Sequence, residues 1–133
     1  MGEILKFPYT KIGEKFFPII PLYCKHKEKE FRLEALIDAG STTSIFKFEV
    51  FEILGLKVEN CKRIPLKGIG GSITAYSHEI SLIIGDKTIK TEVAFSKELE
   101  MKINIIGREG VFENFVVCYN DKEKNVSLAA IQF

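Results

Sequence analysis

The sequence has no excess of charge of either sign and no long apolar segment. Its 19 lysines and arginines nearly balance 18 aspartates and glutamates, so it lacks the electrostatic footprint of a protein that binds nucleic acid or an acidic membrane. No apolar run approaches the ~20 residues that span a bilayer. The first ten residues lack the basic start and apolar centre of a secretory signal. We therefore expect no nucleic-acid partner and no membrane partner.

Paired cysteines are also missing. The three cysteines, Cys24, Cys61 and Cys118, are an odd number without C-x-x-C spacing, which argues against a disulfide framework and against a zinc site. His26 and His78 are far apart in the sequence and form no metal-binding motif, so both are interpreted as surface residues. The sequence thus predicts a cytoplasmic protein with no metal and no other cofactor.

Apolar residues are abundant enough to build one core. They make up 46% of 133 residues, which fits a single folded domain over residues 1–133. They occur in short runs separated by polar turns, without repeats, as expected for an all-β domain with one or two short helices. Residues 1–15 precede the first clear strand pattern and are interpreted as an N-terminal extension available for dimer contacts.

Strand patterns occur along most of the chain. Pro18 and Pro21 confine the first predicted strand to an edge or an irregular segment. Apolar spacing predicts a helix within 46–54, ended by Gly55, and a second short helix carries Val111, Phe112 and Phe115. Polar turns at 25–30, 85–86 and 120–125 each join two strands into a hairpin. The predicted extended segments are 16–24, 31–37, 56–58, 64–66, 73–76, 81–84, 88–95, 103–106, 116–119 and 126–131.

Asp38 is the strongest chemical signal in the sequence. It ends an apolar strand and is followed by Gly40 and Ser41. A carboxylate at the end of a buried strand is costly unless hydrogen bonds or a partner hold it. The chain contains no second copy of this pattern, so a partner acid has to come from another subunit. The alternative is a plain turn in which the carboxylate accepts backbone amides.

A glycine cluster, Gly68-Ile69-Gly70-Gly71, separates two strand patterns and is interpreted as the tip of a flexible β-hairpin. A phosphate-binding loop is disfavoured, because no helix-forming segment and no Lys-Ser/Thr pair follow it.

Three segments in this order resemble the retropepsin-like aspartic proteases, the single-domain relatives of pepsin. Residues 35–41 resemble the apolar-apolar-Asp-Thr/Ser-Gly motif, and residues 68–71 resemble the flap tip. Ile106-Gly107-Arg108 resembles the segment that packs beside the catalytic loop. The resemblance covers residues 16–133 and implies a closed acid-protease barrel that acts as a homodimer on an extended peptide or an unfolded protein.

The resemblance also implies residue roles. Asp38 of each subunit would be catalytic, within an active-site loop of Ala39, Gly40 and Ser41. Ser41 would hydrogen-bond the outer oxygen of Asp38, and Gly40 would offer backbone contacts to substrate. The amide of Ile69 in the flap would reach a substrate carbonyl through water.

The chemistry follows from the pairing of two acids. Carboxylates about 3 Å apart cannot both ionise, so one keeps its proton. The ionised carboxylate takes a proton from water as the water attacks the peptide carbonyl, and the protonated one donates to the carbonyl oxygen. A two-fold axis would supply this pair from Asp38 and its symmetry copy.

Two departures from the family pattern are present. Ala39 replaces the Thr or Ser whose hydroxyl bonds across the dimer. Thr42 replaces the acid expected to pair with Arg108, so we expect another acceptor for that guanidinium. Ala39 supports an alternative function, a catalytically silent peptide-binding or dimerisation module. A third alternative is an inactive, precursor-like monomer whose residues 7–10 shield the site.

Overall fold

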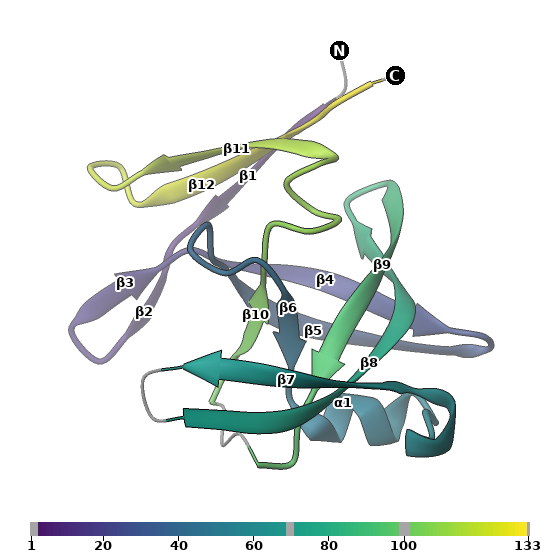
Figure 1. Ribbon diagram of the computed structural model, residues 1–133. Coiled ribbons are helices and arrows are strands. Elements are labelled where there is room, and N and C mark those ends of the chain that lie inside the picture. The colour runs from purple at the N-terminus through teal and green to yellow at the C-terminus, as the bar shows by residue number, and fades with distance from the viewer. Residues whose placement is uncertain (1–2, 69–70, 99–101, 133) are drawn as a thin grey trace.

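The computed structural model describes residues 3–68, 71–98 and 102–132 (Figure 1). These residues form a mostly β structure with one α-helix and one 3-10 helix. In chain order the elements are β1 (Ile4–Pro8), β2 (Thr10–Ile12), β3 (Lys15–Phe17), β4 (Ile19–His26), β5 (Lys29–Ile37), β6 (Ser44–Phe46), α1 (Phe48–Ile53), η1 (Val58–Asn60), β7 (Lys62–Gly68), β8 (Gly71–Ile84), β9 (Lys87–Phe95), β10 (Asn104–Ile106), β11 (Phe115–Asn120) and β12 (Asn125–Ala130).

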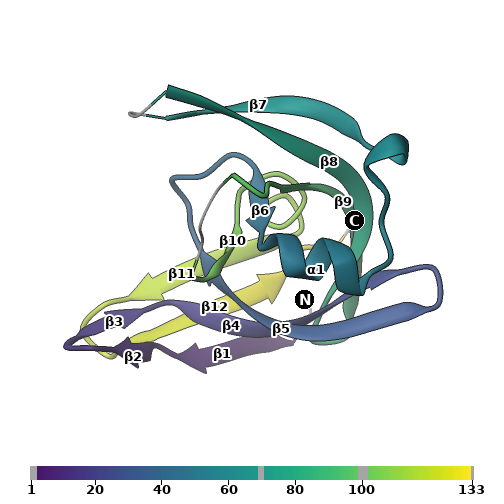
Figure 2. The same ribbon diagram turned by 90° about the horizontal axis from the view of Figure 1, so that it is seen from below.

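The main sheet closes on itself. Its strand order is β4-β5-β10-β6-β9-β8-β7, and β4 also pairs with β8. The second pairing covers Tyr23↔Ile83 to Lys25↔Ser81. Pro21 lies in the part of β4 that pairs only with β5, where its missing N–H costs no ladder bond. The predicted all-β barrel is therefore confirmed, and the β7–β8 hairpin projects from it as an arm (Figure 2).

The core fills this barrel and extends under α1. Strand β5 alternates buried Leu33, Ala35 and Ile37 with more exposed residues, as one-sided packing requires. The ring of Phe95 packs edge-on against Phe46 and Phe51, with centroids 6.3 and 5.3 Å apart. These contacts anchor α1 beside β6 and β9, and so fix the segment that follows the Asp38 loop.

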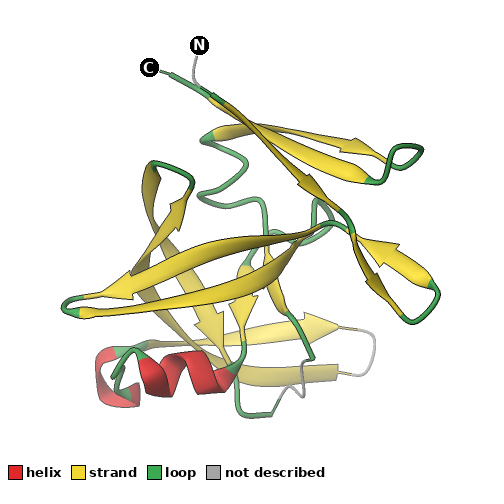
Figure 3. Ribbon diagram, turned by 180° about the vertical axis from the view of Figure 1, so that it is seen from behind, coloured by secondary structure: helices red, strands yellow, loops and turns green. Residues whose placement is uncertain are grey.

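The N-terminal residues are part of the fold rather than an extension. Strand β1 pairs along β12 from Ile4↔Ala129 to Pro8↔Asn125, and β2 pairs with β3. Leu5 and Phe7 pack against the core from the inner face of β1. Figure 3 shows both ends of the chain beside this sheet. A role of this segment in dimer contacts stays a prediction.

Three local predictions were wrong. The strand expected over 16–24 is split at Pro18 into β3 and β4. The segment after Leu56 turns into η1 instead of staying extended. The second helix is absent, because residues 109–114 form turns around Gly110 at a φ of 83° and Phe115 already belongs to β11. A left-handed residue at this point interrupts any α-helix.

Most of the other local predictions were confirmed. Helix α1 ends at Ile53, and Gly55 follows with a φ of 72°, as a left-handed C′ residue does. The hairpins at residues 25–30, 85–86 and 120–125 all form. The two segments expected at 73–76 and 81–84 are parts of one strand, β8. No helix in the described ranges is long and apolar enough to cross a membrane.

Candidate active site

Asp38 lies directly after β5, in the loop that leads to β6. Its backbone N–H donates to the carbonyl of Ile106 at 2.9 Å. One carboxylate oxygen, Oδ1, accepts the N–H of Gly40 at 2.9 Å, and the carbonyl of Asp38 accepts the N–H of Ser41 at 3.1 Å. The side chain is half-buried. The loop is thus an Asx turn, with no hydrogen bond to Oδ2 among the described residues.

The end of β10 packs directly against this loop. Strand β10 runs parallel to β5, with Ile106 opposite Ile37. Gly107 donates its N–H to the hydroxyl of Ser44 at 3.0 Å. A Cβ atom on Gly107 would lie 2.6 Å from the backbone carbonyl of Thr43. Only glycine therefore permits this close approach, and Ile106-Gly107-Arg108 lies beside the Asp38 loop.

Arg108 bonds the residue that stands in place of the expected acid. Its Nη2 donates to the Thr42 hydroxyl at 3.2 Å, and its backbone N–H donates to the carbonyl of Ser41 at 2.8 Å. The guanidinium thus has an acceptor in place of the missing acid, namely the hydroxyl of the residue that replaces that acid.

Ser41 does not bond Asp38 through its hydroxyl. Its Oγ donates instead to the carbonyl of Thr43 at 2.7 Å. A short hydroxyl side chain commonly bonds backbone two residues away in a turn. The role expected for Ser41 is therefore not seen in this chain. Ala39 is exposed next to it and carries no group that could take over that bond.

Tyr119 is a residue of the site that the sequence analysis missed. Its hydroxyl donates to the carbonyl of Ile37 at 2.9 Å, across 82 residues of sequence. Burial raises the pKa of Tyr119 from its ordinary 10.0; a hydrogen bond with the Ala39 backbone acts in the opposite direction, and the charge of Asp38 raises the pKa further. Strand β11 thereby holds the Asp38 loop from the C-terminal sheet.

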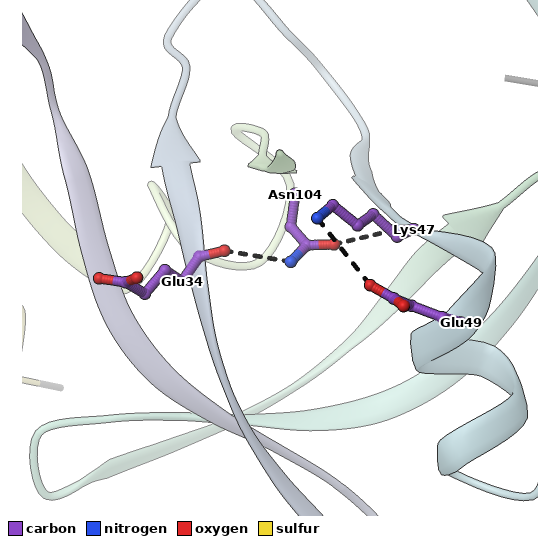
Figure 4. A network of polar contacts seen from close by, with 4 residues as sticks. All are labelled: Glu34, Lys47, Glu49 and Asn104. Atoms are coloured by element: carbon purple, nitrogen blue, oxygen red, sulfur yellow. Dashed lines mark hydrogen bonds and ion pairs between the residues drawn. The ribbon is translucent and has the colours of Figure 1, made fainter. Parts of the chain in front are cut away.

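Asn104 is the second residue that was missed (Figure 4). It is 6% exposed. Its amide nitrogen donates to the carbonyl of Glu34 at 3.1 Å, and its Oδ1 accepts the N–H of Lys47 at 2.8 Å. A buried amide needs such partners. Asn104 thus ties β10 to β5 and to the start of α1, where Lys47 also faces Glu49 with 3.9 Å between charged atoms.

The candidate flap is the β7–β8 hairpin. It is paired from Lys62↔Ser77 to Gly68↔Gly71. Gly71 has a φ of 119°, which favours glycine. The other two predicted flap residues, Ile69 and Gly70, lie outside the described residues. The arm is held at β8 by Thr74, whose carbonyl accepts the hydroxyl of Ser96 at 2.7 Å.

The sequence matches no protein-family model, and no curated protein matches it as a relative. Solved structures do resemble it. A retropepsin-like aspartic protease from Rickettsia conorii aligns with a TM-score of 0.69 and 15% identity, over 98% of this chain and 97% of that one. The EIAV protease complexed with the inhibitor HBY-793 aligns with a TM-score of 0.57 and 18% identity, over 75% of this chain and 89% of that one. The chain therefore has the retropepsin-like all-β fold.

Proposed function

We propose that this chain is an aspartic endopeptidase that works as a homodimer, with Asp38 from each subunit forming one proton-sharing pair. The observation that carries the proposal is the placement of Asp38. Its carboxylate ends a barrel strand, is half-buried, and keeps Oδ2 without a hydrogen bond within the described residues while Oδ1 is fixed by Gly40. The two solved structures compared above are described as proteases.

The geometry suits the chemistry of a shared proton. One carboxylate alone supplies a base or an acid, but peptide hydrolysis through water needs both at once. A second Asp38 within contact of the first would hold one proton between them, since two ionised carboxylates repel strongly at that separation. The backbone N–H of Gly40 orients the carboxylate within its own subunit, so each carboxylate of the pair would be positioned before the subunits meet.

The substrate would be an extended peptide or an unfolded protein. An extended segment bound beneath the β7–β8 arm would gain main-chain hydrogen bonds in the manner of an added strand. The free subunit has no second acid bonded to Asp38 among its described residues, so a monomer would lack the complete machinery. We infer that activity depends on assembly.

The test is cleavage of an unstructured protein at mildly acidic pH. Asp38→Asn should abolish cleavage and leave the unfolding transition nearly unchanged. Asp86→Asn is the matched control, because Asp86 lies exposed in the β8–β9 turn and should keep full activity. Persistent cleavage by Asp38→Asn would refute the proposal.

A mixing experiment tests the shared pair. Asp38→Asn protein is added in an equal amount to the wild type, at a total concentration where the protein is dimeric and its subunits exchange. The activity should fall to about half, because random pairing places half of the wild-type subunits in mixed dimers. A monomeric enzyme would keep its full rate in the mixture.

A silent peptide-binding module is the second candidate, and Ala39 favours it. The cross-dimer hydroxyl bonds that Ala39 cannot form would each contribute ~1 kcal/mol, so the dimer is expected to be weak. A module of this kind would bind extended peptides with no turnover at any protein concentration. Cleavage that increases with protein concentration would exclude it.

A further inference from the structure

The two peptide groups on either side of Asp38 decide where its side chain begins. A peptide group is rigid and planar, so the backbone at Asp38 can turn only about φ, against the group before it, and about ψ, against the group after it. The first group joins Ile37 to Asp38, and the second joins Asp38 to Ala39. Contacts that hold both groups therefore fix the position of the Asp38 Cβ atom.

Backbone hydrogen bonds hold one polar group of each peptide. In the first peptide, the N–H of Asp38 donates to the carbonyl of Ile106 in β10 at 2.9 Å. In the second, the carbonyl of Asp38 accepts the N–H of Ser41 at 3.1 Å. The other polar group of the first peptide is the carbonyl of Ile37, and that of the second is the N–H of Ala39. Both peptides are held completely only if these two groups also have partners.

The hydroxyl of Tyr119 is placed to serve both remaining groups. It donates to the carbonyl of Ile37 at 2.9 Å. Burial raises the pKa of Tyr119, whereas the Ala39 backbone lowers it, as an N–H directed at the hydroxyl oxygen does by stabilising the phenolate. One side-chain hydroxyl is therefore shared by the peptide before Asp38 and the peptide after it.

This hydroxyl comes from the C-terminal sheet, which is anchored in the core. Tyr119 of β11 is opposite Val126 of β12, and Val126 is opposite Phe7 of β1. Directly paired residues on neighbouring strands point to the same face. Val126 is fully buried, and Phe7 packs against the core. A tyrosine has only two side-chain torsions, so the fold, and not the Asp38 loop itself, places the hydroxyl.

We propose that Tyr119 is a positioning residue for peptide hydrolysis, holding the Asp38 carboxylate where it would meet its symmetry copy. This role rests on the proposed function, because two carboxylates share a proton only at a separation of about 3 Å. A displacement of ~1 Å at a catalytic group can cost roughly 100-fold in rate. Since the hydroxyl bonds backbone and acts through Asp38, its loss should lower kcat and leave KM nearly unchanged.

The kinetic test is Tyr119→Phe, assayed on a peptide taken from a cleavage site in an unstructured protein. At protein concentrations where the rate per subunit is constant, kcat should fall by roughly tenfold or more, with KM within about threefold of the wild type. Tyr9→Phe is the matched control. The Tyr9 hydroxyl donates to Asp121, in the turn of the same β11–β12 hairpin, at 2.7 Å, and its loss should leave kcat unchanged. An unchanged kcat in Tyr119→Phe, or equal losses in both variants, would overturn the positioning role.

A second readout by NMR does not require cleavage. The N–H of Gly40 donates to Oδ1 of Asp38 at 2.9 Å, so the Gly40 amide resonance should move with pH as this carboxylate gains a proton. Tyr119→Phe should reduce that movement by about half or more, and Tyr9→Phe should preserve it; an unchanged movement in Tyr119→Phe would overturn the positioning role. If the wild type cleaves nothing, the proposed function fails, and this resonance alone decides whether Tyr119 positions the carboxylate. Urea unfolding confirms that each variant is folded under the assay conditions.

Discussion

Gly107→Ala should destabilise the protein, because the added Cβ atom would overlap a neighbouring backbone segment. Gly107 directly follows β10, where the chain packs against the Asp38 loop. A Cβ atom there would lie 2.6 Å from both the carbonyl carbon and the oxygen of Thr43, and 2.8 Å from the oxygen of Ser41. These are backbone atoms, so no side-chain rotation can relieve the overlap, and one of the two segments has to move.

The cost follows from the bonds that join these segments. Three hydrogen bonds from backbone N–H groups connect them: Gly107 N–H to the Ser44 hydroxyl at 3.0 Å, Arg108 N–H to the Ser41 carbonyl at 2.8 Å, and Glu109 N–H to the Thr42 carbonyl at 2.9 Å. Separating the segments weakens at least one bond at ~1 kcal/mol, and overpacking adds about 1–3 kcal/mol. We expect a total loss of about 2–4 kcal/mol, a large share of the ~5–15 kcal/mol typical of a domain.

The assay is urea unfolding, with Gly40→Ala as the matched control. The Cβ atom of Gly40 would meet only Oδ1 of Asp38, at 3.2 Å, and a side-chain carboxylate can shift. The control should lose less than ~1 kcal/mol, within the range of ordinary substitutions. Equal losses for the two variants, or a loss below ~1 kcal/mol for Gly107→Ala, would refute the close-packing argument.

Two further predictions test the surroundings of the site and the cysteines. Tyr119→Phe removes the hydrogen bond to Ile37 and should lower the free energy of unfolding by ~1 kcal/mol; an unchanged urea midpoint would show that the bond does not hold the loop. Alkylation by iodoacetamide should label exposed Cys118 in the native protein and spare Cys24 until urea is added, because burial raises the pKa of Cys24 to about 12 and only the thiolate reacts. Native labelling of Cys24 at a rate like that of Cys118 would contradict this reading.

Much of the fold is encoded locally and could be predicted. Hairpin turns such as Gly85-Asp86, the period-two pattern of β5 and the glycine that ends α1 depend on neighbouring residues only. The prediction of a second helix was wrong, and the reason is also local. Val111, Phe112 and Phe115 have helical spacing, but Gly110 adopts a left-handed φ of 83°, and nothing in the spacing of apolar residues reports the backbone angle of a glycine.

The missed site residues depend on contacts across the whole chain. Tyr119 reaches Ile37 over 82 residues, and Asn104 reaches Glu34 over 70. In the sequence, Tyr119 is one more residue of a short strand, and Asn104 interrupts an apolar strand. A buried amide in such a strand is the usable signal, because it requires polar partners that the strand itself does not supply.

The two histidines show the same limit. The sequence analysis treated His26 and His78 as independent surface residues, yet their rings are 4.9 Å apart. The pairing of β4 with β8 brings them together, and that pairing is what closes the barrel. Barrel closure depends on the complete sheet. Contacts across the β4–β8 pairing therefore cannot be predicted from single segments of the sequence.

The hydroxyl groups around Asp38 bear on what dimerisation would contribute. Ser41 bonds the Thr43 carbonyl, Thr42 accepts from Arg108, and Tyr119 donates to Ile37. All three bonds form within one subunit, so they support the loop without a partner. Under the proposed function, assembly would then supply the second carboxylate and little of the loop's rigidity. Weak association would therefore lower the concentration of active pairs without altering the rate of each pair, and the rate per assembled dimer should be constant across protein concentrations.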